Sequence, residues 1–494
     1  MATWISDSLA EIRHDDAAVT VTGLTLSSQR VRAGDLYAAP AGVQAHGASY
    51  AAAAVEAGAV AVLTDPHGAD ICAGLPVPVL VVSNPRQLLG GLAARIYGEP
   101  ARALRLVAIT GTQGKTTTTR LADEALQQSG VRSAVVGTVG TRIDGAEIAT
   151  SLTTPEAPDL HALFGVMRER GVQACAMEVS SHALVMGRVD GVIFDVAAFT
   201  NLGRDHLDFH ADLEDYFQAK ASLFTPARSR LGLVNIDDEH GRRLVTEASV
   251  PIRTFAVSGA PADWSAEDIH LTSTGSTFTV RPPAGPPFPA GVPLVGGYNV
   301  ANALCAIAAL GEAGFDPVVV AEAMSRSAGV PGRLERVDAG QDFLAIVDYA
   351  HKPDAVTAAL SALRAQTSGR LLIVLGAGGD RDAGKRPLMG KVAAALADVV
   401  VVTDDNPRTE DPAEIRAAVL AGAREVDAGS RAAIHEIGDR RQAIRLAVSL
   451  ARGGDTVIVA GKGHETGQEV HGTVHPFDDR AVLAEELGEE LAGR

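Results

Sequence analysis

Residues 110–117, Thr-Gly-Thr-Gln-Gly-Lys-Thr-Thr, constrain the fold of this chain more than any other segment. They follow an apolar run, Leu104 to Ile109, and precede a helical pattern in which Leu121 and Leu126 share one face and Gly130 ends the helix. A strand, a glycine-rich turn and a helix in this order form a phosphate-binding loop, because the free N–H groups of the helix N-terminus point at an anion. The segment therefore predicts that the chain binds a nucleoside triphosphate.

The residue types within the loop fit this role. Lys115 supplies a compact positive charge, and the Thr116 hydroxyl suits Mg²⁺. The loop departs from the common G-x-x-x-x-G-K-[ST] pattern, because Ile109 stands where the first glycine is expected. An ordinary glycine-rich turn is the alternative, and a lysine followed by four threonines argues against it. The predicted phosphate-binding residues are Gly111, Thr112, Gln113, Gly114, Lys115, Thr116 and Thr117.

Apolar strands alternate with helical segments in two long stretches, from residue 104 to 235 and from residue 343 to 460. Such alternation is typical of parallel sheets covered by helices, and a chain of 494 residues exceeds the size of one core. We predict an α/β fold with three domains. These are a small N-terminal α/β domain (1–100), a central doubly wound sheet of the P-loop type (101–334) and a C-terminal Rossmann-like α/β domain (335–494). The proline-rich segment 282–289 resembles a linker, but we predict a loop within the central domain.

Composition excludes several classes of function. The net charge of −17 argues against broad nucleic-acid binding, which needs a basic surface. Cys72, Cys175 and Cys305 have no metal-ligand or redox spacing and are expected to be buried thiols. Residues 1–7 lack the regions of a signal peptide, and no apolar stretch reaches the length of a membrane span. We expect a cytoplasmic protein with no membrane or nucleic-acid partner.

Polar clusters end two of the predicted strands. Glu178, Ser180, Ser181 and His182 end one, and residues 200–208, which include His206, end the next. Strand ends of this kind line the ligand crevice of parallel sheets. Glu178 and His206 are candidate Mg²⁺ ligands beside Thr116, although histidine is unusual for so hard a cation. Each residue alone would more often be a satisfied polar group or a helix cap.

The order of eight motifs resembles the Mur ligases: TGTQGKTTT, MEVSSHAL, TNLGRDHLD, GGYNVANALCA, VDYAHKPD, GAGGDRDAGKRP, DDNPR and AGKGHE. Among these ligases it is similar to the MurE type, the UDP-N-acetylmuramoyl-tripeptide synthetases. The resemblance covers nearly the whole chain and is weakest in the first domain. It implies an ATP- and Mg²⁺-dependent ligase of peptidoglycan precursor synthesis that adds diaminopimelate to UDP-N-acetylmuramoyl-L-alanyl-D-glutamate through an acyl phosphate.

The resemblance also implies a modified lysine. Lys220 matches the lysine that the family carries as a carbamate, an anionic oxygen ligand for a second Mg²⁺. A helix-surface lysine that packs its stem is the alternative. The implied catalytic residues are Lys115, Glu178, His206 and Lys220, and the implied metal ligands are Thr116, Glu178, His206 and the carbamate of Lys220.

Two substrate sites follow from matched positions. The ATP site would be completed by Asn299, Asn302, Arg333, Asp348, His351 and Lys352. The UDP-sugar site would use Ser28, His46, Thr153, Thr154, Ser180, Ser181 and Arg188. In the first domain the family's Asp-Ser-Arg appears as Ser27-Ser28-Gln29, so the uridine contacts there stay open. Asn299 and Asn302 could instead cap the following helix, and His46 could belong to a turn.

The amino-acid site would use the loop Asp405-Asn406-Pro407-Arg408. An arginine fork pairs with a carboxylate in two parallel hydrogen bonds, so Arg408 suits the distal carboxylate of diaminopimelate. Gly461 and Glu465 would receive the distal ammonium, and Arg381 the other carboxylate. A turn with a surface arginine is the alternative.

Several functions compete with this one. They are the same reaction with L-lysine, a folylpolyglutamate synthetase, a MurC or MurF ligase, and a P-loop ATPase that works as a switch or transporter. We expect a monomer with small-molecule substrates only. Whether the diaminopimelate is meso or LL is open at this point.

Overall fold

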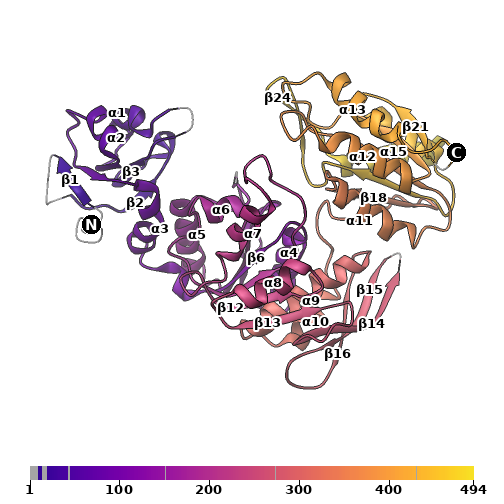
Figure 1. Ribbon diagram of the computed structural model, residues 1–494, viewed down its shortest axis with the longest axis horizontal. Coiled ribbons are helices and arrows are strands. Elements are labelled where there is room, and N and C mark those ends of the chain that lie inside the picture. The colour runs from indigo at the N-terminus through magenta and orange to yellow at the C-terminus, as the bar shows by residue number, and fades with distance from the viewer. Residues whose placement is uncertain are drawn as a thin grey trace. The chain divides into compact units, whose positions relative to one another are not determined.

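The computed structural model describes residues 9–13, 19–42, 45–150, 152–272, 274–429 and 431–493. The chain forms two compact units, which are described separately: Met1–Phe255 with Ile307–Pro317, and Ala256–Ala306 with Val318–Arg494. Both contain sheets flanked by helices, so the predicted α/β class is confirmed (Figure 1). Residues 1–7, on which the signal-peptide expectation rests, lie outside the described residues.

The first unit begins with a five-stranded sheet in the order β1-β5-β4-β3-β2. Strands β2 to β5 are parallel, and β1 pairs antiparallel with β5. Its strands are β1 (Leu9–Arg13), β2 (Gly23–Thr25), β3 (Asp35–Ala39), β4 (Ala61–Thr64) and β5 (Val79–Val82). Its helices are η2 (Ser28–Arg30), η3 (Gly47–Tyr50), α1 (Ala51–Glu56), α2 (Pro66–Ile71) and α3 (Pro85–Ile96). Successive strand residues point to opposite faces, and this sheet buries apolar side chains in a separate cluster on each.

The larger sheet of the same unit carries the phosphate loop. Its parallel part has the order β13-β12-β11-β6-β10-β7, and antiparallel β8 and β9 extend it. The strands are β6 (Arg105–Thr110), β7 (Ser133–Gly137), β8 (Gly140–Ile143), β9 (Ala146–Ile148), β10 (Ala174–Glu178), β11 (Phe194–Phe199), β12 (Ser229–Asn235) and β13 (Ile252–Ala256). The helices are η4 (Pro100–Ala103), α4 (Lys115–Gln128), α5 (Ala157–Glu169), α6 (Ser181–Val185), α7 (Leu213–Ala221) and α8 (Glu239–Glu247).

Strand β6 lies between β10 and β11, and the strand order runs outward from it in both directions. In parallel sheets such a reversal opens a crevice at the carboxyl ends of the strands. The phosphate loop follows β6, Glu178 ends β10, and residues 200–210 follow β11. The topology therefore brings the three predicted polar segments to one sheet edge.

The second unit contains an antiparallel ribbon and a second α/β sheet. The ribbon is β14 (Trp264–Thr272), β15 (Gly275–Arg281) and β16 (Phe288–Val292), beside α9 (Gly297–Glu312) and α10 (Pro317–Met324). The sheet has the order β17-β18-β22-β19-β20-β21 and is parallel except at β17. Its strands are β17 (Glu335–Arg336), β18 (Leu344–Asp348), β19 (Leu371–Leu375), β20 (Val399–Val402), β21 (Ala433–Glu436) and β22 (Thr456–Ala460).

Helices cover both faces of this sheet and bury two apolar clusters (Figure 1). They are α11 (Pro353–Arg364), α12 (Lys385–Leu396), α13 (Pro412–Arg424), α14 (Arg440–Leu450) and α15 (Asp479–Gly493). A separate hairpin, β23 (Gly467–Val470) and β24 (Thr473–Pro476), follows β22.

Most predicted elements are present, and the additions are at the sheet edges. The apolar runs appear as β6, β7, β10, β11 and β12 in the first unit and as β18, β19, β20 and β22 in the second. The proline-rich segment connects the paired strands β15 and β16, as expected of a loop. The antiparallel strands β8, β9 and β14 to β16 were not predicted, because short half-exposed strands lack a continuous apolar run.

The three cysteines are buried and free, as predicted. Burial raises the pKa of the Cys175 and Cys305 thiols. Within the described ranges, none of the helices has the length and apolar character needed to cross a membrane.

Candidate active site

The phosphate loop has the backbone that its sequence requires. Gly111 and Gly114 have φ angles of 148° and 86°, which L side chains rarely adopt. A Cβ on Gly111 would lie 1.9 Å from the Thr200 hydroxyl, so glycine is needed here for close approach as well. Helix α4 begins at Lys115, and the N–H groups of its first turn have no partner within the helix. These groups suit an anion.

The segment after β11 holds the phosphate loop through hydrogen bonds. The Gln113 N–H donates to the Asn201 side-chain oxygen (2.9 Å), and the Thr200 hydroxyl donates to the Gln113 carbonyl (2.6 Å). The Thr112 hydroxyl accepts from the Gly203 N–H (3.0 Å) and lies 3.1 Å from the Tyr216 hydroxyl. The loop is therefore held in shape by the protein alone.

Two lysines meet at one carbonyl oxygen. Lys115 Nζ donates to Gly111 O (2.8 Å) and Thr112 O (3.1 Å), and Lys220 Nζ donates to Gly111 O (2.9 Å). Lys220 is 1% exposed and lies 4.4 Å from the centre of the Tyr216 ring. The surface-lysine alternative is therefore wrong, because helix α7 directs this side chain inward to the phosphate loop.

Glu178 ends β10, and hydrogen bonds hold its carboxylate in a buried position. Its carboxylate accepts hydrogen bonds from the Thr138 N–H (2.8 Å) and hydroxyl (3.0 Å), and it is 1% exposed. A Cβ on Gly137 would lie 2.3 Å from this carboxylate, so only glycine leaves room for it. A buried carboxylate with two donors keeps lone pairs for a cation.

His206 lies among aromatic rings. Its φ is 54°, a left-handed conformation, and its Nε2 lies 3.2 Å from the Asp205 carboxylate. The His182 ring lies edge-on to it (4.8 Å between centroids) and stacks on Phe209 (3.9 Å). Burial, more than the nearby His210, lowers the pKa of His182.

The donor set fits Mg²⁺ rather than a metal held by protein alone. Among the described residues, no group of three or more His, Cys, Asp and Glu could hold a metal ion. Mg²⁺ commonly binds through one or two carboxylates, water and substrate phosphates. Glu178 beside a phosphate loop that contains Thr116 offers that chemistry.

Several candidate UDP-sugar residues have structural partners. Thr154 is fully buried, and its hydroxyl donates to the Glu178 carbonyl (2.8 Å). Thr153 contacts the Thr138 hydroxyl (3.1 Å), and Ser180 caps α6 by accepting from the Ala183 N–H. These three residues therefore support the structure around Glu178, and a UDP-sugar contact through them stays a prediction.

His46 precedes the short helix η3 and has two structural partners. Its Nδ1 accepts from the Ala48 N–H (3.1 Å), so its Nε2 carries the hydrogen that bonds to Asp65 (3.0 Å). These bonds fit the turn alternative, and a UDP-sugar contact through His46 stays a prediction. Ser28 begins the short helix η2.

Arg188 belongs to a network that joins the first sheet to the larger one. It donates to Glu156 (2.9 Å), whose other oxygen accepts from Arg86 of α3 (3.0 Å). Arg30 of η2 pairs in two parallel hydrogen bonds with Asp159, which lies three residues after Glu156. Arg188 is therefore held among contacts between the two sheets, and a UDP-sugar contact through it stays a prediction.

In the second unit, the two asparagines of α9 bond locally. Asn299 donates to the Val295 carbonyl (2.8 Å), and Asn302 donates to the Asn299 side chain (3.0 Å). Both asparagines lie inside α9, and both bonds are donated by their side-chain amides, so the alternative that they cap the helix is not confirmed. A nucleotide contact through either residue stays a prediction.

Arg333, Asp348 and His351 converge around Tyr349. The Arg333 guanidinium lies 4.3 Å from the centre of the Tyr349 ring, and His351 Nδ1 donates to the Tyr349 carbonyl (2.7 Å). Asp348 accepts from the Leu334 and Ala350 N–H groups (2.7 and 2.8 Å), and burial raises its pKa. Burial, with help from Lys352 and Lys385, lowers the pKa of His351 to about 3.

The amino-acid candidates meet at the ends of β20 and β22. Asn406 donates to Glu465 (3.0 Å) and accepts from the buried Lys462 (3.1 Å), and Lys462 also lies 3.8 Å from Asp405. A Cβ on Gly461 would lie 2.5 Å from the Asp405 carboxylate. Asp405, Asn406, Gly461 and Glu465 are therefore brought together, as predicted.

Arg408 is fixed in a strained conformation. Its φ is 52°, and its Nη1 donates to the Gly379 carbonyl (2.6 Å). Its Nε lies 3.3 Å from the Glu469 carboxylate of the hairpin. Strained backbone of this kind persists where surroundings over-determine it and often marks functional sites. The guanidinium is therefore held by two other segments, which the alternative of a turn with a surface arginine did not predict.

Arg381 is the candidate least drawn into this cluster. It is exposed, and its Nη1 donates a long hydrogen bond to the adjacent Asp380 carbonyl (3.4 Å). Asp380 itself bonds to Thr409, so the two loops that carry Arg381 and Arg408 are tied together.

Four further residues were not predicted from the sequence: Thr138, His210, Lys462 and Glu469. Lys462 stands within the AGKGHE motif, and that position was a usable signal. The other three act through contacts between segments far apart in the sequence, which no local pattern reveals.

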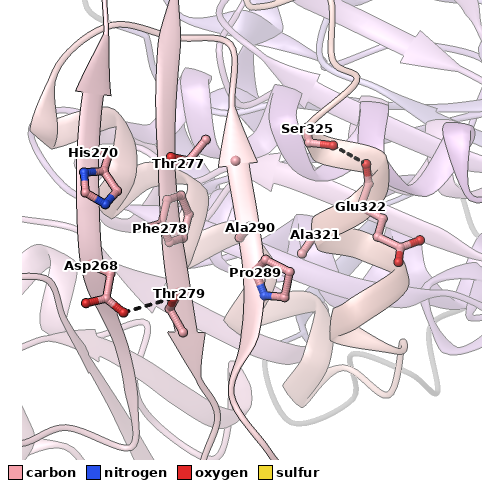
Figure 2. A pocket seen from close by; sticks show the side chains of 11 residues that line it. Asp268, His270, Thr277, Phe278, Thr279, Pro289, Ala290, Ala321, Glu322 and Ser325 are labelled. Atoms are coloured by element: carbon pink, nitrogen blue, oxygen red, sulfur yellow. Dashed lines mark hydrogen bonds between the residues drawn. The ribbon is translucent and has the colours of Figure 1, made fainter.

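An open groove of about 480 Å³ lies elsewhere in the second unit, over the ribbon and α10. Figure 2 shows Asp268 and His270 on one side and Glu322 and Ser325 on the other. None of the predicted site residues lines it.

Comparisons with known proteins define the family. Profiles of three Mur ligase domains match the chain: "Mur ligase family, catalytic domain" over residues 20–97, "Mur ligase middle domain" over 109–310 and "Mur ligase, glutamate ligase domain" over 332–463. The chain belongs to the Mur ligase family.

Individual relatives are similar over nearly their whole length. The UDP-N-acetylmuramoyl-L-alanyl-D-glutamate–2,6-diaminopimelate ligase of Streptomyces avermitilis is 56% identical, with 97% of this chain and 96% of the relative covered. A UDP-N-acetylmuramyl-tripeptide synthetase of Leifsonia xyli is 46% identical, with coverage of 97% and 94%. A solved UDP-N-acetylmuramoyl-L-alanyl-D-glutamate–2,6-diaminopimelate ligase has a TM-score of 0.67 at 34% identity, covering 95% of each chain. These likenesses confirm the resemblance to the MurE type.

Proposed function

We propose that this protein is an ADP-forming ligase that joins 2,6-diaminopimelate to UDP-N-acetylmuramoyl-L-alanyl-D-glutamate. The observation that carries the proposal is the 56% identity, over 97% of the chain, to a ligase of that name. The amino-acid site supports the proposal, because Arg408 lies in the same loop as Asp405 and Asn406, and Asn406 donates to Glu465. An arginine and carboxylates in one site complement the distal carboxylate and ammonium of diaminopimelate.

The chemistry proceeds in two steps. A carboxylate is a poor acylating agent, so the D-Glu carboxylate first attacks the γ-phosphorus of ATP and gives an acyl phosphate and ADP. The diaminopimelate amine, after losing a proton, then adds to the acyl carbon, and inorganic phosphate leaves. Mg²⁺, when bound, neutralises the negative charge on the phosphates during transfer.

The protein supplies position and charge. The N–H groups at the start of α4 and the Lys115 ammonium hold the β- and γ-phosphates. The Thr116 hydroxyl and the Glu178 carboxylate are the groups that would hold the cation. Fixed groups of this kind stabilise charge without reorganising during the reaction.

Lys220 is proposed to act as a carbamate. In the amine form its ammonium shares the Gly111 carbonyl with Lys115, so two like charges lie together in a buried place. After the ammonium loses a proton, the amine adds CO₂ and releases a second proton, which leaves a carbamate anion; this anion attracts Lys115 instead of repelling it. The anion also adds an oxygen ligand for a second Mg²⁺.

The three-domain division stays part of the proposal. Two family profiles, over 20–97 and 109–310, fall within 1–100 and 101–334, and the third, over 332–463, begins three residues before 335; this agreement supports the boundaries. A folylpolyglutamate synthetase is disfavoured by the DNPR and GKGHE motifs and by the domain that precedes the phosphate loop.

The test is phosphate release from ATP with UDP-N-acetylmuramoyl-L-alanyl-D-glutamate and one of three amino acids: meso-diaminopimelate, LL-diaminopimelate or L-lysine. We expect turnover with a diaminopimelate and at least about 100-fold lower kcat/KM with lysine, which leaves Arg408 unpaired. Turnover with lysine instead would keep the ligase and reject the amino-acid assignment. ATP hydrolysis without either substrate would favour the switch ATPase.

A further inference from the structure

Three side chains form a buried chain of hydrogen bonds beside Glu178 and His206. The Ser181 Oγ lies 2.9 Å from His210 Nε2, and His210 Nδ1 lies 3.0 Å from the Asp215 carboxylate. Ser181 begins α6, His210 follows β11, and Asp215 belongs to the first turn of α7. The His210 side chain is fully buried, whereas the Asp215 carboxylate reaches the surface.

The order of the partners fixes the direction of the hydrogen bonds. The bond to His210, and then the Ala211 N–H, lower the pKa of Asp215, which is therefore an ionised acceptor. Nδ1 of His210 must then carry the hydrogen. In the neutral ring Nε2 accepts, so the Ser181 hydroxyl donates to it. The Ser181 oxygen is thereby oriented with its lone pairs directed away from His210.

The same histidine also anchors the turn that carries His206. The backbone N–H groups of His210 and Phe209 both donate to the His206 carbonyl (2.8 and 3.1 Å). His206 has a φ of 54°, which a histidine adopts only when its surroundings hold it there. The ring of His210 thus ties the His206 turn to a residue three positions after Glu178.

We propose that His210 is a positioning residue that holds the two protein-derived metal ligands, Glu178 and His206, in one arrangement through its hydrogen bond to Ser181, while Asp215 fixes the tautomer of the ring. The role rests on the proposed function only in so far as these two residues bind a cation. Loss of a residue that orients a metal ligand without binding the metal itself commonly lowers the metal affinity 10- to 100-fold.

Two amide substitutions separate the two halves of the chain. His210→Gln places an amide near the position of Nε2 and can keep the bond to Ser181. His210→Asn places an amide near Nδ1, keeps the bond to Asp215 and loses Ser181. Ser181→Ala removes the same bond with a much smaller change in volume, so it guards against a variant that fails to fold.

The primary readout is Mn²⁺ binding, followed by electron paramagnetic resonance with a non-hydrolysable ATP analogue and no amino acid. We expect His210→Asn and Ser181→Ala to raise the Mn²⁺ Kd about tenfold. His210→Gln should stay within about threefold of the unaltered protein, and the melting temperatures of His210→Gln and His210→Asn should agree. His240→Gln, which alters a histidine of α8 that contacts Phe217, is the matched control and should leave the Kd unchanged.

An unchanged Mn²⁺ Kd in His210→Asn and Ser181→Ala would overturn the proposal. Equal losses of affinity in the Gln and Asn variants would also overturn it, because a merely space-filling histidine predicts that result. Failure of the proposed function is a separate outcome: the unaltered protein would then bind Mn²⁺ with nucleotide but release no phosphate with the UDP-sugar substrate and diaminopimelate.

Discussion

The phosphate loop of the first unit and the amino-acid site of the second are built in different ways. Around the loop, Glu178 and Lys220 are each 1% exposed, and backbone groups and threonines hold them. Around the amino-acid site, Arg408 and Glu465 are partly exposed and are held by side chains from neighbouring loops and a hairpin. We call the buried residues around the phosphate loop, including Glu178 and Lys220, the frame. We call the segments around Arg408 and Glu465 the loops.

This contrast corresponds to a division of labour. Phosphoryl transfer depends on position and charge, which a rigid, water-poor frame supplies. Choice among amino acids depends on a few side chains, and loops on a fixed scaffold can exchange those without disturbing the fold. We therefore expect substitutions in the frame to reduce turnover and substitutions in the loops to change KM for one substrate.

The largest effect is expected in the frame. Lys220→Ala should lower kcat about 10²- to 10³-fold, because the proposed carbamate is lost from a buried, charged place. Short-chain carboxylic acids such as acetate or propionate should restore part of the activity by supplying a carboxylate there. The measurement is phosphate release with and without the acid.

Lys391→Ala is the matched control, because Lys391 is an exposed partner of Glu425, and its activity should not respond to added acid. Lys220→Ala with full loss and no restoration by any acid would argue that Lys220 acts as an ammonium.

A smaller effect confined to one substrate is expected in the loops. Arg408→Ala should raise the diaminopimelate KM about 10- to 100-fold, since the distal carboxylate loses a paired cation. Arg408→Lys should also raise it, because a lysine cannot form two parallel hydrogen bonds. The ATP KM should change less than about threefold in both.

Arg441→Ala in α14, an exposed arginine paired with Glu485 and Glu486, is the control. Equal increases in the KM of diaminopimelate and ATP would mean that Arg408 only supports the loop.

The frame was more predictable from sequence than the loops. Buried parallel strands leave continuous apolar runs, and a phosphate loop needs glycine and lysine at fixed spacing, so β6, α4 and the residues around them could be found directly. The inward direction of Lys220 was open between two readings, because a lysine on a nine-residue helix gives no sign of which face is covered.

The partners of the site could not be found in the same way. Thr138 binds Glu178 from 40 positions away, and Glu469 pairs with Arg408 from a hairpin of two short, half-exposed strands. Such contacts depend on how segments meet in the fold. Sequence patterns within a window of one helix or strand carry no information about them.

A third effect concerns stability in the second unit. The folded-state pKa of His351 is about 3, against about 6.5 for an exposed histidine, mainly because burial disfavours its charged form. As the pH falls from about 6.5 to about 3, the unfolded chain binds a proton that the folded chain does not, so stability decreases. The slope is at most about 1.4 kcal/mol per pH unit, and lower in practice because the ring is partly in contact with solvent.

His351→Gln should remove this contribution. Urea unfolding at pH 7.0 and pH 5.0 should show a smaller loss of stability in His351→Gln than in the unaltered protein. Identical losses would mean that His351 titrates alike in the folded and unfolded chains.

The smallest effect sharpens the contrast between frame and loops. Glu469 lies 3.3 Å from the Arg408 Nε and is itself partly exposed, so its charge partly neutralises the cation that should receive the distal carboxylate. Glu469→Gln keeps an oxygen that can accept from Nε and removes the competing negative charge. We expect the diaminopimelate KM to fall, by no more than about fivefold because the pair is exposed to solvent, with the ATP KM unchanged. A rise in the diaminopimelate KM would show instead that the charge of Glu469 is needed to hold Arg408. In that case the loops would share the fixed character of the phosphate site.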